Sequence, residues 1–459
     1  MPAQGTRRVR YDAAIIGAGA NGLAAAALLG RAGRSVIVLD RAQTCGGRCT
    51  TREFHPGFRA SPFCDEVAPI PVKVFRALDL ARHGAIFARV PQQRFSAAIA
   101  ALRAQAIAEA AQAQEHGWFG RRQSRPWPLQ DWLHRSLKEA CADLGYGAMA
   151  GALEGRAADP AFDGSALHLL SPGSGGSGIL MGGLGTLGRA LEAAARAAGA
   201  DFALGMEATD LRHRKRRAEG VRLADGTEIE ARAVISTLDL RRTFFSLFAW
   251  KDLPPQTIER VAQYRHAAAR ARLLIALDGP TPFGAPVYLG DRTAGYAAWR
   301  SAAIAEMPPM TLRPVSAADP GLAPDGKAVV TATLGCVPYR LFDGPWTNEK
   351  RAALKERVLA ALDLEAPGIR SKALAAELIV PPDIEAALGL SEGDLDGGEI
   401  APDQMFALRG FENCPGGRTP VRGLYLGGSS APLGPIATCA AGAAAAAALA
   451  ADLEAGLLK

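Results

Sequence analysis

Apolar runs separated by glycines predict a parallel βαβ unit at the start of the chain. Residues 11–16, Tyr-Asp-Ala-Ala-Ile-Ile, form a short apolar strand that leads into Gly17. A helix rich in alanine and leucine is expected over 20–33 and ends at Gly33. The unbroken apolar run over 35–40, Ser-Val-Ile-Val-Leu-Asp, is typical of a strand buried on both faces of a parallel sheet.

The pattern is less regular over residues 41–165 and becomes regular again near residue 181. In the irregular part we expect helices over 97–114 and 129–144, and loops over 117–128 and 172–178. Beyond it we expect a helix that opens at 181–187 and runs to 198, strands over 201–206, 207–212 and 233–237, and a hairpin over 221–229. Asp225-Gly226 supplies the positive φ that a tight hairpin turn needs.

Strands and helices continue to alternate to the end of the chain. The expected strands cover 271–277, 327–334 and 423–427, and the expected helices cover 348–363, 382–388 and a segment from about 438. This order predicts an α/β protein in which a Rossmann-like nucleotide-binding domain is interleaved with an α+β substrate domain. The first domain would comprise 1–80, 180–247 and 405–459; the second would comprise 81–179 and 248–404, with a reduced helical part.

Composition excludes several classes of protein. With 49% hydrophobic and 21% charged residues, the chain is not a disordered polypeptide. Its net charge of +6 comes with no long basic block, and we expect the run Arg212–Arg217 to be a solvated hairpin, so nucleic acid is not an expected partner. Seven scattered cysteines predict neither a disulfide framework nor a metal site. The alanine-rich stretch 439–451 is too short to span a bilayer. We expect a cytoplasmic protein and leave peripheral membrane contact and the oligomeric state open.

The first chemical motif is Gly17-Ala18-Gly19-Ala20-Asn21-Gly22, between the first strand and the first helix. Gly17 permits a tight turn, Gly19 lets a pyrophosphate approach the backbone, and Gly22 lets helix and strand pack closely. The free N–H groups of the helix N-terminus suit an anion. Asp40 ends the second strand, where a carboxylate accepts hydrogen bonds from ribose hydroxyls. The sequence therefore predicts dinucleotide binding.

Two further motifs extend this site. Gly46-Gly47-Arg48 follows Asp40, and its arginine can form a bidentate hydrogen bond with a pyrophosphate. Near the end of the chain, Gly427-Gly428-Ser429 and Ile436-Ala437 lie between a strand and a helix. They form a second backbone site that could hold the ribityl phosphate of FAD, which NAD would not need.

These motifs resemble the flavin-dependent amine oxidase and phytoene desaturase superfamily. The nearest branch is the phytoene-desaturase-like one, with carotenoid desaturases, retinol saturase and the pyridine nucleotide-disulfide oxidoreductase domain-containing protein 2 type. The similar segments include 17–22, 46–48, 55–59, 182–187, 234–244, 366–369, 403–406 and 418–426. The resemblance implies an FAD-binding domain and an oxidoreductase. The implied FAD-binding residues are Gly17, Ala18, Gly19, Ala20, Asn21, Gly22, Asp40, Arg41, Gly46, Gly47, Arg48, Ala208, Gly428, Ser429, Ile436 and Ala437.

Three departures from the family pattern concern the substrate and the pose of the flavin. Region 85–165 is short, so the substrate-binding part is reduced. Pro432-Leu433-Gly434-Pro435-Ile436 replaces the usual glycine run, and Gly442-Ala443-Ala444 replaces the usual Gly-Arg-Asn. The stretch 392–398 lacks the His-Gly that the branch often carries. The substrate and the electron acceptor stay undetermined.

The resemblance implies that an apolar small molecule is desaturated or dehydrogenated by hydride transfer to flavin N5, with oxygen or a quinone as the final acceptor. Flavin chemistry requires orientation and electrostatics from the protein more than a nucleophile, so catalytic residues are left unassigned. Weak candidates are His55, Cys64 and Glu66, and Cys439 is expected to be inert and buried. Two alternatives stay open: an amine or amino-acid oxidase that releases hydrogen peroxide, and a non-catalytic carrier or complex partner with the flavin fold.

Overall fold

The computed structural model describes most of the chain. The described residues are 10–88, 100–105, 132, 134–144, 153, 155–170, 178–267, 269–412 and 414–458. The predicted loops 117–128 and 172–178 lie almost wholly outside these residues, as does most of the predicted helix 97–114, of which 100–105 is described and helical. Within the predicted helix 129–144, residue 132 is helical, residues 134–136 are not, and α5 begins at Leu137.

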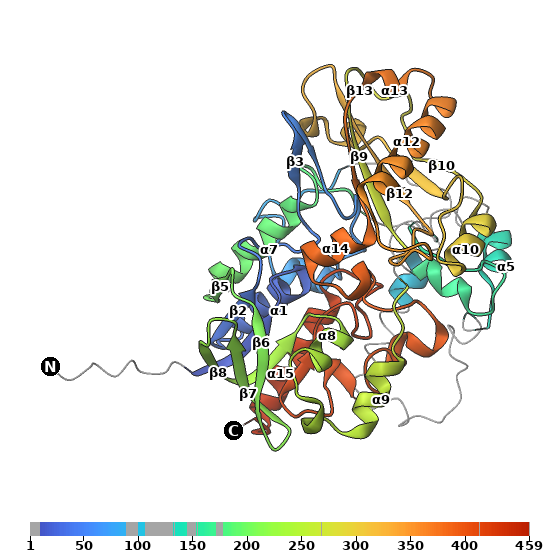
Figure 1. The fold of residues 1–459 in the computed structure, drawn as a ribbon. Helices are drawn as coiled ribbons and strands as arrows, with labels where there is room; N and C mark the ends of the chain where they lie inside the picture. The colour runs from blue at the N-terminus through green and yellow to red at the C-terminus, as the bar shows by residue number, and fades with distance from the viewer. Residues whose placement is uncertain are drawn as a thin grey trace.

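A mostly parallel sheet forms the lower half of the molecule (Figure 1). Its strands run in the order β5-β2-β1-β8-β7-β6, and β14 pairs with the second half of β8. Residues 13–16 of β1 and 36–39 of β2 are apolar and buried, as expected for strands covered on both sides. The strands are β1 Arg10–Ile16, β2 Val36–Asp40, β5 Asp201–Leu204, β6 Ala208–Arg214, β7 Arg217–Leu223, β8 Glu228–Ser236 and β14 Leu424–Leu426.

Helices cover both faces of this sheet. On one face, α1 (Ala20–Arg31), α7 (Gly185–Ala197) and α15 (Ala440–Glu454) share one apolar core with β1 and β2. α1 and α15 approach closely, since a Cβ at Gly442 would lie 2.0 Å from the carbonyl oxygen of Asn21. On the other face, α8 (Leu240–Phe245) and α9 (Pro255–Gln263) pack through a second core. The sheet is therefore buried on both sides, as the Rossmann-like prediction requires.

The predicted hairpins are confirmed. β7 and β8 pair in antiparallel fashion around Asp225 and Gly226, where Gly226 has a φ of +87°. The basic run lies at the turn between β6 and β7, where Lys215 and Arg216 are exposed and have positive φ angles. This run is a solvated hairpin, as expected.

A five-stranded antiparallel sheet forms the upper half, in the order β10-β11-β12-β9-β13 (Figure 1). Every residue of its two central strands, β9 and β12, is buried. One face packs against α12, and the other packs against the hairpin β3–β4 and α14. The elements are β3 Arg52–His55, β4 Phe58–Ala60, β9 Ala271–Leu277, β10 Val287–Leu289, β11 Met310–Arg313, β12 Ala328–Leu334, β13 Ala373–Ile379, α12 Asn348–Glu365 and α14 Pro381–Leu388.

Shorter helices complete the described fold. They are α2 Val72–Ala77, α5 Leu137–Leu144, α10 Arg292–Arg300, α11 Val315–Ala318 and α13 Ile369–Lys372. Short 3-10 turns cover Ser165–Leu170, Trp250–Asp252, Pro320–Leu322, Ser391–Gly393, Pro402–Gln404, Phe406–Leu408 and Pro415–Gly417. The segments that build each sheet match the predicted α/β class, while the boundaries of the two domains stay a prediction.

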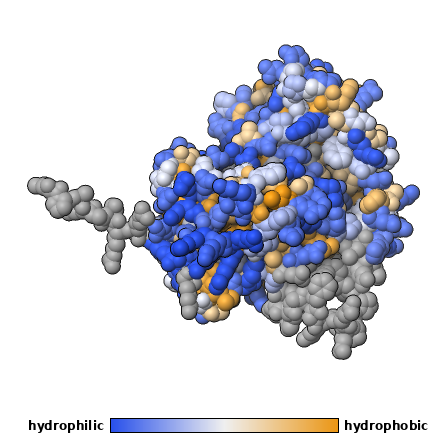
Figure 2. All heavy atoms as spheres, turned by 60° about the horizontal axis from the view of Figure 1, so that its bottom comes forward, coloured by the Kyte–Doolittle hydropathy of each residue, from blue (hydrophilic) through white to orange (hydrophobic). Residues whose placement is uncertain are grey.

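The surface in Figure 2 is mainly hydrophilic, with separate smaller hydrophobic areas. Among the described helices, none is long and apolar enough to cross a membrane. Peripheral membrane contact stays a prediction.

Candidate active site

The site lies where β1 and β8 end side by side. The two strands are parallel neighbours, and their register pairs Ile16 with Ser236. The chain leaves β1 into α1 on one face of the sheet, and leaves β8 toward α8 on the other. A crevice therefore opens beyond the carboxyl ends of these strands, the place where ligands bind in doubly wound sheets.

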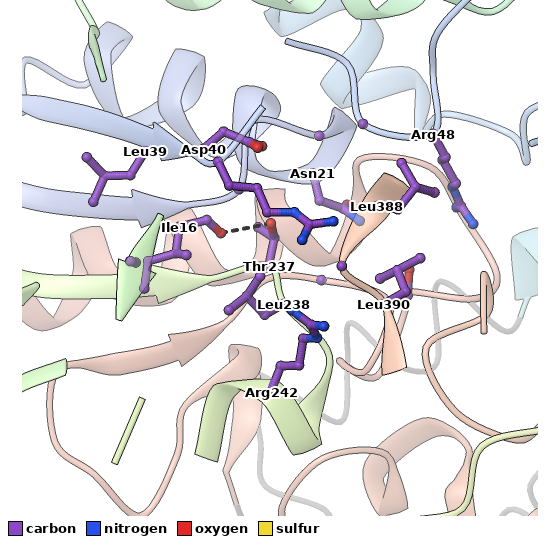
Figure 3. Close-up of a pocket in the computed structure, with 18 of the residues that line it drawn as sticks. Ile16, Asn21, Leu39, Asp40, Arg48, Thr237, Leu238, Arg242, Leu388 and Leu390 are labelled. Atoms are coloured by element: carbon purple, nitrogen blue, oxygen red, sulfur yellow. Dashed lines mark hydrogen bonds between the residues drawn. The ribbon is translucent and has the colours of Figure 1, made fainter. Parts of the chain in front are cut away.

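A hollow follows this crevice and joins most of the residues predicted to bind the cofactor (Figure 3). We call it the first hollow. Its walls come from the loop after β1, the end of β2, the segment around residue 207, the residues after β8 and β14, and the end of α14. The predicted residues that line it are Gly17, Gly19, Ala20, Asn21, Asp40, Arg41, Gly47, Arg48, Ala208, Gly428 and Ser429.

Two glycines shape the first hollow in different ways. Gly17 has a φ of +104°, and a Cβ there would lie 2.1 Å from the hydroxyl oxygen of Thr237. Thr237 donates a hydrogen bond of 2.9 Å to the carbonyl of Ile16, which closes the turn after β1 (Figure 3). A Cβ at Gly19, in contrast, would meet no atom within 4 Å. The backbone of Gly19 is thus open to a ligand, beside the N-terminus of α1.

Asp40 holds the loops around the hollow through hydrogen bonds, and its carboxylate remains able to accept more of them. One carboxylate oxygen accepts the N–H of Ala18 at 2.7 Å, and the other accepts the N–H of Ala42 at 2.8 Å. Each carboxylate oxygen can accept a further hydrogen bond, so ribose hydroxyls could still be bound. Arg41 also lines the hollow, and its guanidinium donates to the carbonyl of Ala386 at 2.6 Å.

The other predicted cofactor residues lie outside the walls of the first hollow. Ala18 and Gly46 join the two glycine loops through a 2.8 Å hydrogen bond. Gly22 is needed for packing, because a Cβ there would lie 1.9 Å from the carbonyl oxygen of Gly17. Ile436 and Ala437 are buried in separate apolar clusters, and their contact with a flavin ring stays a prediction.

Several residues of the first hollow were not predicted. They include Thr237, Arg242, Leu388 and Leu390, which are labelled in Figure 3, and also Thr438. The sequence held one signal, since Thr237 ends the predicted strand 233–237 and a parallel neighbour of β1 must end at the same edge. Leu388 and Leu390, at and just after the end of α14, carry no such signal, because α14 packs against the second sheet.

A second hollow adjoins the first through two shared residues, Arg48 and Thr438. We call it the middle hollow. Cys64 and Glu66, two of the weak catalytic candidates, line it, whereas His55 lines none of the three hollows described here. Burial raises the pKa of the Cys64 thiol, so it is not a thiolate at neutral pH. Glu66 forms a 2.6 Å ion pair with Arg313.

A third, outer hollow adjoins the middle one through Arg156 and Asp396. Apolar and aromatic side chains form part of its wall, including the stacked rings of Tyr296 and Trp299, whose centroids lie 6.0 Å apart. His168 also lines it and is neutral, because burial and the charge of Arg156 lower its pKa to about 3. The three hollows thus adjoin one another in a row that runs from the edge of the first sheet to the second sheet.

Two other features bear on the chemistry. Cys439, at the start of α15, is buried, and burial raises the pKa of its thiol. The thiol is therefore inert despite its place at a helix N-terminus. Within the described residues, no group of three or more His, Cys, Asp or Glu side chains could hold a metal ion.

Comparison with known families identifies the kind of site. Residues 15–79 match a family model described as an NAD(P)-binding Rossmann-like domain. Residues 92–364, more than half of the chain, match the model of the flavin containing amine oxidoreductases. The chain belongs to this flavin containing amine oxidoreductase family. It is an oxidoreductase with FAD as its cofactor, and the resemblance inferred from the motifs is confirmed.

Known proteins of similar sequence or similar fold align with most of the chain. The pyridine nucleotide-disulfide oxidoreductase domain-containing protein 2 of Mus musculus is 25% identical over 530 residues, which cover 94% of this chain and 91% of that protein. An oxidoreductase from Methanosarcina mazei shares the fold with a TM-score of 0.59 and 20% identity, covering 96% of this chain and 99% of that one. A putrescine oxidase bound to putrescine has a TM-score of 0.58 at 17% identity, covering 97% and 100%.

The first hollow fits FAD. Open space beside the Gly19 backbone and the N-terminus of α1 suits a pyrophosphate, which carries negative charge. Arg48 faces the same hollow and, among the described residues, forms no ion pair with a carboxylate. Asp40 stands at the end of β2, where the ribose hydroxyls of a dinucleotide are bound in this fold.

Proposed function

We propose that this family member is an FAD-dependent dehydrogenase that introduces a double bond into a small molecule with an apolar body. The observation that carries the proposal is the series of hollows. The first fits the cofactor, the middle one adjoins it at Arg48 and Thr438, and the outer one offers aromatic side chains for an apolar group. A substrate that enters by the outer hollow would bring a C–H bond beside the cofactor.

In this proposal the backbone of Gly17, Gly19 and Gly428, with Asp40 and Arg48, holds the cofactor. When bound, FAD would accept the hydride of one substrate C–H bond, the proton of the neighbouring carbon would be lost to bulk solvent, and the two electrons would pass on to oxygen or a quinone. The chain's own residues orient the substrate, exclude water and supply fixed charge. Glu66 is engaged by Arg313 and Cys64 is protonated, so neither side chain is ready to act as a nucleophile.

Amine oxidation is the second candidate. Putrescine oxidase has a similar fold, and carboxylates line the outer hollow, which would favour an entering cation. The carboxylates are Asp159, Asp394, Asp396 and Glu399. Asp396 and Glu399 are already paired with arginines, which weakens this argument.

Anaerobic reduction of the bound flavin separates these functions. The FAD-loaded protein is mixed without oxygen with a panel of isoprenoid polyenes, saturated carboxylic acids and amines, and absorbance near ~450 nm is followed. We expect a desaturable substrate to bleach the flavin and amines to leave it oxidised. Bleaching by an amine, with peroxide release on admission of oxygen, would favour the oxidase. A flavin that no compound reduces would favour the non-catalytic carrier.

A further inference from the structure

Exposed hydrophobic side chains gather on one part of the surface. Among the described residues, four large hydrophobic side chains are exposed within two segments that pair with each other, 67–88 and 178–183. They are Val72, Ile86, Phe87 and Met181, of which Val72 and Ile86 are 63 and 61% exposed. Single exposed hydrophobic residues are common in proteins, whereas a cluster marks a surface that meets an apolar partner.

Backbone pairing brings the two segments side by side. Phe87 and Leu180 form an antiparallel bridge, and the N–H of Met181 donates to the carbonyl of Ile86 at 2.9 Å. Ile86 and Met181 therefore lie opposite each other, on the same face of this short ribbon. Leu180 points the other way and is buried in the first core. The ribbon thus has an inner face that packs and an outer face that is apolar and exposed.

Helix α2 continues this apolar surface. The ring of Phe75 in α2 meets the ring of Phe87, with centroids 6.1 Å apart. Val72 lies three residues before Phe75, so both side chains are on the same side of the helix. The exposed hydrophobic surface therefore runs from the ribbon onto α2. We call it the apolar patch, and it consists of Val72, Phe75, Ile86, Phe87 and Met181.

Exposed cations surround the apolar patch. Three of them belong to the same segment of the chain, 67–88. A fourth ends α1, where its guanidinium donates to the carbonyl of Ala77 at the end of α2. These cations are Arg31, Lys73, Arg76 and Arg82.

Negative charge is scarce in the same segments. Residues 67–88 and 178–190 contain one carboxylate side chain, that of Asp79. It lies 3.9 Å from Arg82 in a largely exposed pair, which is a weak interaction. Asp319 approaches from beneath and accepts the N–H of Gly182 at 2.6 Å and that of Gly183 at 3.1 Å, but it is buried. The exposed side chains of these segments therefore carry a net positive charge.

The apolar patch is built on a segment that also lines the middle hollow. Val67 and Ala68 belong to the wall of that hollow. The backbone of Val67 exchanges two hydrogen bonds of 3.1 Å with Gly178. Gly178 packs against the ring of Phe87, since a Cβ there would lie 2.4 Å from a ring carbon. The surface thus adjoins the part of the molecule assigned to the substrate.

We propose that the apolar patch and its cations dock the protein on an anionic lipid surface. The hydrophobic side chains would enter the boundary between the headgroups and the acyl chains, while the lysine and arginine side chains stay at the lipid phosphates. A second copy of the chain fits less well, because a symmetric contact would bring the same positive charges together. The inference goes beyond the proposed function and does not depend on it.

The test measures how the FAD-loaded full chain binds lipid vesicles in a flotation assay. One set of vesicles is phosphatidylcholine alone, and the other also contains the anionic phosphatidylglycerol. We expect binding to the anionic vesicles to be at least about 10-fold tighter and to weaken when salt is added. The double variants Val72→Ser/Ile86→Ser and Lys73→Gln/Arg76→Gln should each reduce this binding by at least about 10-fold.

Leu364→Ser is the matched control. Leu364 is 79% exposed near the end of α12, but it stands between Asp363 and Glu365, so its surroundings are acidic. This variant should bind anionic vesicles as the wild type does. All these substitutions concern exposed side chains, and we expect each variant to keep the FAD content and the melting temperature of the wild type.

Several results would overturn the proposal. They are a wild type that floats with neither kind of vesicle, a wild type that binds both kinds equally, and double variants that bind as the wild type does. Gel filtration supplies another, a dimer that Val72→Ser/Ile86→Ser dissociates, because a second copy would then cover the apolar patch. Anaerobic reduction of the flavin needs no vesicles, so a failure of this proposal leaves the test of the proposed function unaffected.

Discussion

Gly19→Val is expected to lose FAD while the protein stays folded. The backbone at Gly19 has a φ of −77° and a ψ of 177°, which any residue can adopt. A Cβ there meets no atom within 4 Å, so the space beside this residue is open to a side chain. The larger side chain would enter the first hollow where the pyrophosphate approaches. We expect FAD affinity to fall by at least about 100-fold, which corresponds to about 2.7 kcal/mol.

The measurement compares the FAD content of the purified variant and the Kd for added FAD with those of the wild type. Gly284→Val is the matched control, because a Cβ at Gly284 also meets no atom within 4 Å and this residue lines none of the three hollows. The apoproteins of both variants should have the melting temperature of the wild-type apoprotein. A Gly19→Val protein that carries a full complement of FAD would contradict this account of the first hollow.

Arg272→Leu should destabilise the protein by about 3–5 kcal/mol, the cost typical of removing one partner of a buried ion pair. Arg272 is fully buried in β9, and its guanidinium binds both oxygens of Asp65, whose side chain is 4% exposed. The variant leaves Asp65 charged in the interior, with the hydroxyl of Thr331 still bound at 2.8 Å. This pair joins the segment after β4 to the second sheet, so its loss weakens the connection between the two halves.

Urea denaturation of the FAD-loaded proteins gives the free energy of unfolding. The double variant Arg272→Leu/Asp65→Leu should recover much of the loss, because no charge is then left unpaired. Arg370→Leu serves as a control, since the Arg370–Glu356 pair is about half exposed and should contribute at most about 1 kcal/mol. If the single and double variants were equally unstable, packing rather than charge would explain the effect.

The cofactor side of the site was predictable because its signals are local in sequence. Gly17, Gly19 and Asp40 belong to one βαβ unit, and the unit's short connections bring them to one edge of the sheet. Gly428, predicted from the same pattern of a strand that runs into glycines, also lines the first hollow. The start of the last helix was placed too early, because Cys439 has a left-handed φ of 66° and α15 begins at Ala440.

The substrate side could not be predicted in the same way. Its charged lining combines Glu66, Arg156, Arg270, Arg313 and Asp396, which lie far apart in sequence and meet through the packing of the second sheet. Each of these residues is unremarkable alone, since arginines and carboxylates are usually exposed. The expectation of an apolar substrate came from the resemblance and held no information on these contacts.

The visible absorption spectrum of the purified protein, with its cofactor released by heat and identified, tests the central claim most directly. The account predicts non-covalent FAD with bands near ~375 and ~450 nm, typical of an oxidised flavin used as a redox cofactor. A colourless protein that also fails to bind added FAD would contradict it, because the first hollow would then hold no flavin.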